Sequence, residues 1–563
     1  MTWGTRRALI IILLLIVIIG IGVAVSAVGR VPSRSTLVIR LEGTIEEQRP
    51  TDLFSAFSGE TIPVTHDYTD ELDTARNDPR VKALVVRVGL LSTGWAKLEE
   101  IRSHILSFRS SGKPSICYLG GDGIGNPEIY VASACQQVWL VPTDPVDIHG
   151  MMAESTFLRG SLDKLKIIPD YYHIAEYKTA TNQLTEKKFT PAHHEEVQTL
   201  LKGIYDQYLT DVSQARGLDR GQFEKLLNQG PLSAEEALSG KLVDRLAYWD
   251  QVGEFVREKA GAWKPVSMGE YRPRVKNRGF NRIAVVHATG LIISGESGNT
   301  PGGGFIMGGD SVAEDLRTAR RDPGIKAIVL RIDSGGGSAV ASEVIRREVE
   351  LAKGAKPVVV SMSDVAASGG YWIAMSANRI VAEPDTITAS IGVFIGKLNV
   401  SGFLNMLGIS TDYIATSDNA TLFSAQQSFT PAQRDWIQKS LQETYGRFTQ
   451  GVAAGRKMNV GDVDKIGKGR VWTGAQAKGL GLVDELGGLD TAIAEAKQLA
   501  QISPESSVQI ERFPREKTFF EMVMEKDRDE ESARGLSIEG ILKQISGPTG
   551  SVQARMPFDL TIR

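Results

Sequence analysis

The chain has 563 residues, of which 42% are hydrophobic and 23% are charged, so it can form several folded domains and is too apolar for a disordered chain. Its 64 Lys and Arg against 67 Asp and Glu give a net charge of −3. This near balance lacks the basic excess of nucleic-acid-binding proteins, and no nucleic-acid partner is expected.

The first predicted element is the apolar run Ala8–Val28, which follows Arg6 and Arg7. A run of this length can cross a bilayer as a helix. Because positive residues stay on the cytoplasmic side, residues 1–34 are predicted to form a cytoplasmic tip and a single transmembrane anchor, with the rest of the chain outside. A cleaved signal peptide ending near Val25-Ser-Ala27 is the alternative.

The two halves of the chain repeat each other. Asn77–Val88 returns as Arg321–Ile332, nearly residue for residue, and Phe189–Ala192 returns as Phe429–Ala432. The offset falls from 244 (321 minus 77) to 240 (429 minus 189), as small loop deletions would produce. This self-similarity indicates two copies of one fold.

Each copy alternates β-rich runs such as Ala327–Leu330 with helical patterns such as Ala339–Lys353, which predicts a layered α/β domain with parallel strands. The glycine-rich stretch Ser297–Asp310 is expected to be either a mobile loop near the site or a surface loop without a functional role. The predicted domains are a first copy over 35–267, a linker over 268–281, a second copy over 282–510 and a C-terminal extension over 511–563.

A strand-to-helix turn in the second copy carries the first candidate site residue. The strand Pro357–Ser361 runs through the small residues Ala366–Gly370 into an apolar helix, and Ser368 lies at the turn. Unpaired N–H groups and a positive dipole end at a helix N-terminus suit a nucleophile. A helix cap is the alternative use of this serine, and Asn126, the equivalent residue of the first copy, would serve that use as well.

A serine hydroxyl needs a base to take its proton. His287 is the only histidine of the second copy and lies in a predicted strand, so a Ser-His-Asp triad is disfavoured. A lysine can act as the base when burial favours its neutral form. Lys178 of the first copy is the candidate, and the second copy has Asp418 there. The first copy thus has the lysine without the serine, and the second has the serine without the lysine, as expected if both copies contribute to one site. A solvated surface lysine is the alternative.

A glycine-rich turn could supply the third component of such a site. Arg331–Ser338, with three consecutive glycines, follows a buried strand and precedes a helix. Glycine N–H groups can approach a developing oxyanion closely. A phosphate cradle is the rival use, but the Gly-Lys-Ser/Thr ending of that motif is absent.

The two cysteines, Cys117 and Cys135, are expected to be buried free thiols by default, although a location outside the cytoplasm permits a disulfide. The seven histidines and two cysteines show no metal-ligand spacing, and no metal or cofactor is expected.

Four segments resemble the signal peptide peptidase A (protease IV) family in its long, duplicated form, within a likeness that spans Ser35 to Ile502. These segments are Glu176–Ala180, Arg331–Ser338, Ala367–Tyr371 and Thr388–Gly392. The resemblance implies two tandem crotonase/Clp-protease-like repeats after an N-terminal transmembrane helix. It also implies a membrane-anchored serine endopeptidase with a Ser/Lys dyad that degrades cleaved signal peptides and other hydrophobic peptides through an acyl-enzyme.

The resemblance also assigns roles to residues of this sequence. Ser368 would be the nucleophile, Lys178 the general base and Ser390 the residue that orients Lys178. An oxyanion hole would come from N–H groups of Gly369 and of Gly336 or Gly337. Departures from the family pattern are Asp333, Gly335, Asp364 and Ala389.

The family further implies a homo-oligomer such as a tetramer, in a bacterial inner membrane, with the catalytic domains on the periplasmic side. Released signal-peptide fragments would be the partners, and the N-terminal helix would hold the enzyme near them. Two other functions stay open at this point: a non-catalytic peptide-binding membrane scaffold, and an acyl-CoA enzyme of crotonase type.

Overall fold

The computed structural model describes residues 31–49, 63–121, 123–271, 279, 281–300, 304–515, 552–556 and 561–562. Almost all of the predicted anchor, part of the predicted linker and most of the C-terminal extension lie outside these residues. Within the described ranges, no helix is both long and apolar enough to cross a membrane.

The first copy is built on a six-stranded parallel sheet in the order β7-β4-β3-β2-β1-β8. Its strands are β1 (Ser35–Gly43), β2 (Val81–Leu91), β3 (Ser115–Leu119), β4 (Gln137–Leu140), β7 (Arg245–Leu246) and β8 (Pro265–Ser267). Its helices are α3 (Thr65–Asn77), α4 (Trp95–Ser110), α5 (Asn126–Ala132), α6 (Arg159–Lys164), α7 (Asn182–Thr185), α8 (Pro191–Arg216), α9 (Arg220–Gln229), α10 (Ala234–Ser239), α11 (Trp249–Ala260) and α12 (Met268–Tyr271).

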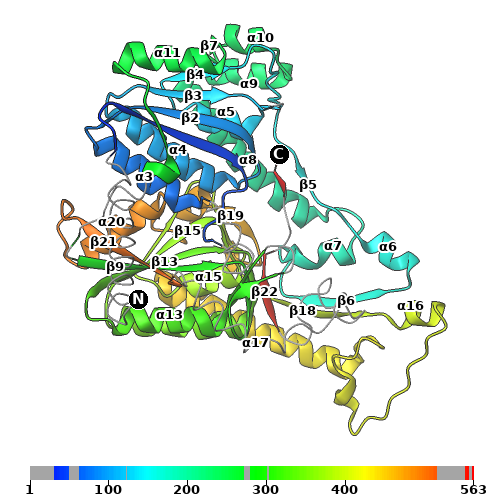
Figure 1. Ribbon diagram of the computed structural model, residues 1–563. Helices are drawn as coiled ribbons and strands as arrows, with labels where there is room; N and C mark the ends of the chain where they lie inside the picture. Colours follow the sequence, from blue (N-terminus) through cyan, green and yellow to red (C-terminus); the bar gives the residue numbers. More distant parts are fainter. Residues whose placement is uncertain are drawn as a thin grey trace, which may run out of the picture.

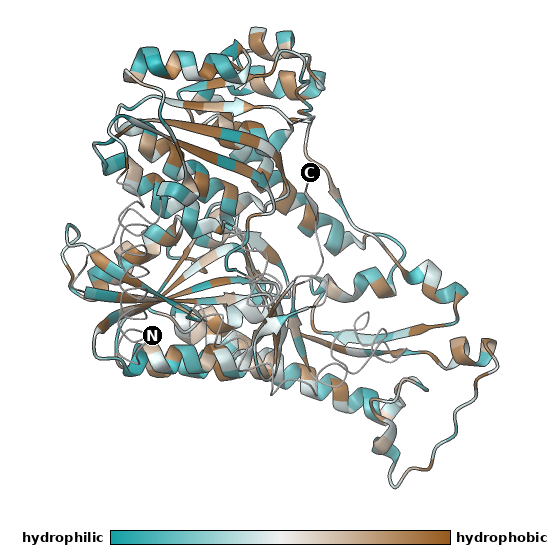
Figure 2. Ribbon diagram, viewed as in Figure 1, coloured by the Kyte–Doolittle hydropathy of each residue, from teal (hydrophilic) through white to brown (hydrophobic). Residues whose placement is uncertain are grey.

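The second copy repeats this order as β20-β16-β15-β13-β9-β21, again all parallel, which confirms the two α/β copies. Its strands are β9 (Asn281–Thr289), β13 (Ile325–Ser334), β15 (Val358–Ala367), β16 (Arg379–Ala382), β20 (Glu485–Leu486) and β21 (Val508–Phe513), with β17 (Ile387–Ala389) and β19 (Val471–Thr473) added beside β15. Its helices are α13 (Gly309–Arg321), α14 (Ala339–Lys353), α15 (Gly369–Ala374), α16 (Ser401–Met406), α17 (Pro431–Arg456), α18 (Val460–Ile466), α19 (Gly474–Gly479) and α20 (Leu489–Leu499). Figure 1 shows the two copies stacked, and Figure 2 shows apolar residues along their buried strands.

A third sheet joins the two copies and the C-terminal extension, in the order β11-β12-β10-β14-β22-β18-β6. Its strands are β6 (Ile168–His173), β10 (Leu291–Ile293), β11 (Gly298–Asn299), β12 (Phe305–Gly308), β14 (Gly336–Ser338), β18 (Phe394–Asn399) and β22 (Gln553–Arg555), and a separate pair holds β5 (Ala153–Glu154) and β23 (Thr561–Ile562). Strand β6 of the first copy pairs antiparallel with β18 of the second and lies beside it in Figure 1.

The glycine-rich stretch Ser297–Asp310 differs from its prediction. Instead of a loop throughout, it contains β11 and β12, and β12 pairs in parallel with β10. Backbone pairing to neighbouring strands holds Gly298 and Gly308, which have no side chain to pack.

Buried ion pairs hold the copies against each other. Arg331 of the second copy, 1% exposed, contacts Glu47 at 2.8 Å and Glu100 at 2.6 Å, both from the first copy. Lys97 of the first copy contacts Asp333 at 2.8 Å and Asp364 at 3.1 Å. Asp333 and Asp364, two of the departures from the family pattern, therefore both pair with Lys97 of the other copy.

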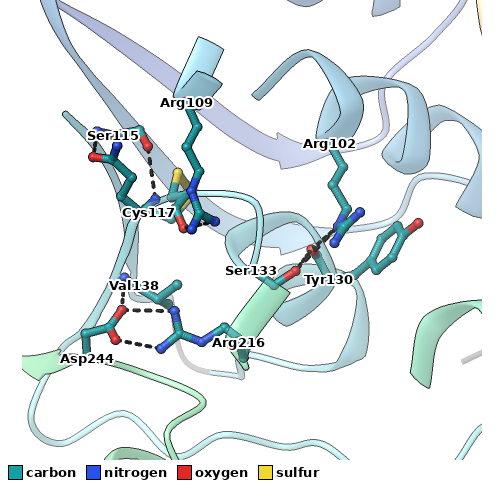
Figure 3. Close-up of a disulfide and its surroundings, with 11 residues drawn as sticks. Arg102, Arg109, Ser115, Cys117, Tyr130, Ser133, Val138, Arg216 and Asp244 are labelled. Atoms are coloured by element: carbon teal, nitrogen blue, oxygen red, sulfur yellow. Dashed lines mark hydrogen bonds and ion pairs between the residues drawn. A yellow bond between two sulfur atoms is a disulfide. The ribbon is translucent and has the colours of Figure 1, made fainter. Parts of the chain in front are cut away.

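Cys117 and Cys135 form a disulfide (Figure 3), so the expectation of free thiols is wrong. Cys117 lies in β3, and Cys135 lies in the short connection between α5 and β4. Because α5 packs back on the sheet and β4 pairs with β3, the crossover brings the two cysteines together.

Removing this disulfide is expected to destabilise the first copy. The bond closes a loop with a sequence separation of 18, for which the chain-entropy model gives roughly 3 kcal/mol. The Cys117→Ala/Cys135→Ala double variant should show that loss in urea unfolding. Reductant should lower the stability of the wild type and leave the double variant unchanged; equal stability with and without reductant would contradict the prediction.

Candidate functional site

Ser368 is held in an unusual backbone conformation between β15 and α15. Its φ of 55° and ψ of −110° are sparsely populated by residues other than glycine, and such a conformation costs about 1–3 kcal/mol. Its N–H donates to Ala389 O at 2.7 Å, and its carbonyl accepts from Trp372 N at 2.8 Å. The side chain makes no capping bond to α15, so the helix-cap interpretation does not describe it.

Lys178 comes from the other copy, from the loop that follows β6. Ile174 N donates to Val393 O at 3.1 Å and Tyr177 N donates to Lys468 O at 3.2 Å, so two backbone bonds hold this loop to two segments of the second copy. Lys178 is fully buried, and its Nζ lies 2.7 Å from Ser368 Oγ. The surface-lysine alternative is therefore wrong.

Burial lowers the pKa of Lys178 to about 7, and the Glu196 carboxylate acts in the opposite direction. Taking the ammonium out of water disfavours its charged form. Near neutral pH a large fraction of Lys178 is consequently an uncharged amine that can accept a proton.

Ser390 is the second hydroxyl on this amine. Lys178 Nζ lies 3.0 Å from Ser390 Oγ and 3.3 Å from Ser390 O. Ser390 Oγ donates to Gly469 O at 3.2 Å, which leaves its lone pairs to accept from the lysine. Ala389 has a φ of 66°, a left-handed conformation that glycine adopts without a steric penalty and that is unfavourable for alanine.

The glycines of the predicted oxyanion hole lie in two elements next to the serine. Gly336 and Gly337 are in β14, and Gly369 opens α15. A Cβ on Gly336, whose φ is 95°, would lie 2.6 Å from the amide nitrogen of Gly369. Only glycine at position 336 lets the two backbone segments come this close. The Gly369 amide therefore lies beside the glycine turn and next to Ser368.

At the equivalent positions, the described residues of the first copy form no such site. Asn126 begins α5 and accepts from the Tyr208 hydroxyl at 3.3 Å, inside the core. Asp418, the equivalent of Lys178, begins a short 3-10 helix (Asp418–Thr421) without buried residues. The structure thus brings Lys178 of the first copy together with Ser368 of the second, as the comparison of the two copies predicted.

Glu196 of α8 was not singled out from the sequence. It is fully buried, and its carboxylate accepts from Thr179 Oγ1 at 3.1 Å and from Val471 N at 2.8 Å. Burial raises its pKa to about 8. It therefore connects the lysine loop, through Thr179, with β19 of the second copy. Its position four residues before Leu200, on the apolar face of the helix, was the signal that could have found it.

Outside this site, potential metal ligands come together once in the described part of the chain. Asp73, His104 and Asp490 place ligand atoms within 4.8 Å of one another. His104 Nδ1 lies 2.9 Å from Asp73, and this bond helps to raise the pKa of His104 to about 9 against the effect of burial. Ion pairs of His104 with Asp73 and Asp490 explain why these three side chains lie together. They connect α3 and α4 to α20.

A buried serine hydroxyl bonded to a buried lysine amine, beside glycine amides, is the arrangement typical of a serine hydrolase. Residues 107–262 and 350–503 match the peptidase family S49, one segment in each copy. The chain belongs to peptidase family S49, and its activity class is that of a serine protease.

Its relatives match over most of its length. The chain is 34% identical to the chloroplastic serine protease SPPA of Arabidopsis thaliana over 541 residues, which cover 94% of this chain and 78% of that protein. It is 34% identical to protease 4 of Salmonella typhi over 543 residues, covering 92% and 86%. Protease 4 of Haemophilus influenzae is 32% identical over 507 residues, covering 85% and 81%.

Proposed function

We propose that this protein is a membrane-anchored serine endopeptidase in which Ser368 and Lys178 form a catalytic dyad. The observation that carries the proposal is the 2.7 Å bond between Lys178 Nζ and Ser368 Oγ, formed between two buried side chains from different copies. A hydroxyl becomes a useful nucleophile when a neutral base accepts its proton, and burial provides that base near neutral pH.

In the proposed reaction, Ser368 Oγ attacks the carbonyl carbon of a peptide bond as its proton passes to Lys178 Nζ. N–H groups of Gly369 and of Gly336 or Gly337 stabilise the oxyanion. The protonated lysine then gives its proton to the leaving amine, and the peptide bond breaks. Water hydrolyses the acyl-serine by the same steps. Ser390, which receives a lysine N–H, would keep the Nζ lone pair directed at Ser368.

The proposed substrates are cleaved signal peptides and other hydrophobic peptides. One relative, 32% identical over 184 residues, is named a putative signal peptide peptidase SppA from Enterococcus faecium. An extended peptide can add to the edge of a sheet through main-chain bonds that are independent of its sequence. β14, next to the serine, lies between β10 and β22, so a peptide could pair with β14 only in place of β22. Each copy is proposed to have the crotonase/Clp-protease-like form of the fold.

The proposed location is a bacterial inner membrane, with residues 1–34 as a single-pass anchor and both copies on the periplasmic side. The Cys117–Cys135 disulfide supports an oxidising compartment. A homo-oligomer such as a tetramer is also proposed. The arm over residues 401–423 supports it, because apolar side chains on this arm are exposed: Met406, Leu407, Ile409, Tyr413 and Ile414.

The test is covalent labelling of the full-length protein with a fluorophosphonate, which reacts with activated serines. We expect one adduct, on Ser368, located by mass spectrometry of the digested protein. Ser368→Ala should lose the adduct and the hydrolysis of apolar fluorogenic peptides. An adduct on another serine, or unchanged hydrolysis by Ser368→Ala, would contradict the proposal.

The pH dependence follows from the direction of the lysine shift. Because the pKa of Lys178 is lowered to about 7, kcat/KM is expected to fall as pH drops below about 7, where the amine gains a proton, and to level off above it. The Glu196 carboxylate raises the pKa of Lys178. Because the pKa of Glu196 is itself raised to about 8, only a minority of Glu196 is ionised near pH 7. Glu196→Gln should therefore move the acid limb only slightly to lower pH.

Glu195→Gln is the matched control, because Glu195 is the exposed neighbour on the same helix. Its acid limb should coincide with that of the wild type. A wild-type limb at pH 9 or above, roughly where an unperturbed lysine would place it, would contradict a neutral lysine at the site.

A further inference from the structure

Strand β22, from the C-terminal extension, fills the space between β14 and β18. It runs antiparallel to β14 with the register Gly336↔Arg555, Gly337↔Ala554 and Ser338↔Gln553. On its other side Gln553 pairs with Phe394 of β18. Figure 1 shows β22 in red next to β18. A segment almost two hundred residues beyond Ser368 in the sequence is thus a strand in the sheet beside the site.

The main-chain bonds of this segment extend beyond the strand itself. Ala339 N donates to Val552 O at 3.2 Å, and Met556 N donates to Gly335 O. The segment Val552–Met556 therefore follows the whole glycine turn, in the manner of an extended peptide added to a sheet edge. Such pairing uses the backbone and does not require a particular sequence.

The carbonyl group of Ala554 lies against the glycines to which the oxyanion hole was assigned. A Cβ on Gly336 would lie 2.0 Å from Ala554 O, and a Cβ on Gly369 would lie 2.9 Å from the same oxygen. Gly369 directly follows Ser368. The oxygen of one particular peptide bond, Ala554–Arg555, is consequently placed between the two elements that would hold the carbonyl oxygen of a substrate.

We infer that β22 is an internal occupant of the substrate position, with Ala554 in place of the residue on the acyl side of the cleaved bond. This inference rests on the proposed function. Two consequences follow: a peptide reaches Ser368 only when β22 has left, and the site prefers a small side chain at the Ala554 position.

The burial of the two neighbouring side chains supports the second consequence. Ala554 is fully buried and belongs to the apolar core of the second copy, together with Ile292, Val393 and Ile395. The side chain of Arg555 is exposed. A large residue at position 554 would have to displace packed core atoms, whereas position 555 faces solvent and tolerates change.

The experiment compares full-length Ala554→Trp, Arg555→Ala and the wild type in hydrolysis of one fluorogenic peptide. Ala554→Trp is expected to expel β22 and raise kcat/KM about tenfold, because apparent affinity scales with the open fraction. Arg555→Ala, the matched control, should behave as the wild type. The isolated peptide Val-Gln-Ala-Arg-Met should inhibit the Ala554→Trp protein competitively, and the same peptide with Trp for Ala should not.

Substrate preference provides an independent measurement. Two peptides that differ only in Ala or Trp on the acyl side of the cleaved bond should differ in kcat/KM by roughly 10-fold or more, in favour of Ala.

Peptide hydrolysis by the wild type that Ala554→Trp leaves unchanged, together with equal use of the Ala and Trp substrates, would overturn the inference and leave the dyad intact. If Ala554→Trp fails to fold, the inhibition and preference measurements are made on the wild type and decide the question. Absence of both hydrolysis and Ser368 labelling in every form would instead count against the proposed function.

Discussion

Replacing Lys178 by Met is expected to lower kcat/KM for an apolar peptide by about 10²- to 10⁴-fold, the usual contribution of a positioned general base. Met has a similar length and no basic nitrogen. Because Lys178 is fully buried and burial already disfavours its charged form, the variant should fold with at least the stability of the wild type. Ser368 Oγ would keep its contact with Gly392 O at 3.4 Å.

Lys188→Met is the matched control, since Lys188 lies ten residues further on and is exposed. It should retain wild-type kinetics. The fluorophosphonate reaction of Lys178→Met should slow in parallel with hydrolysis, because both reactions need the activated hydroxyl. A Lys178→Met protein with activity close to that of the wild type would eliminate the lysine as the base.

Replacing Arg331 by Met is expected to destabilise the protein by about 3–5 kcal/mol, because it leaves buried carboxylates without their cation. Arg331 contacts Glu47 and Glu100 and also donates to Ser361 Oγ at 2.8 Å. The Arg331 guanidinium helps to hold the pKa of Glu47 far below its usual range despite burial. Urea unfolding of the purified variant measures the loss.

Two further variants make this measurement specific. Arg331→Met/Glu47→Gln/Glu100→Gln removes the uncompensated charges, and it should recover much of the lost stability. Arg347→Met changes an exposed arginine of α14, whose side chain is 61% accessible, and should stay within about 0.5 kcal/mol of the wild type. A loss for Arg331→Met no larger than that of Arg347→Met would mean that the ionic contact does not hold the copies together.

This contact matters for the site because the site needs both copies in register. Lys178 reaches Ser368 from the loop that follows β6, a strand of the first copy that pairs with β18 of the second. Any shift between the copies would change the distance between Nζ and Oγ. The attraction within a buried ion pair offsets the cost of desolvation only when the pair has good geometry. The pairs made by Arg331 and Lys97 therefore favour one relative placement of the copies.

Duplication let the sequence alone determine much of this protein. The repeated segment at Asn77–Val88 and Arg321–Ile332 predicted two α/β copies, because strand and helix patterns are local and each copy preserves them. The turn at Ser368 was recognisable because a strand, small residues and a helix follow one another directly. Comparing the copies singled out Lys178, which no local pattern marks.

Only the tertiary structure decided how the distant parts meet. Glu196, the Cys117–Cys135 disulfide, the addition of β6 to β18 and the insertion of β22 beside β14 all depend on contacts between segments that are far apart or on opposite sides of a crossover. Such contacts follow from how whole sheets and helices pack, and they leave no periodic pattern in the chain. Local patterns determined the elements and the nucleophile candidate, whereas packing between the copies determined which side chains share the site.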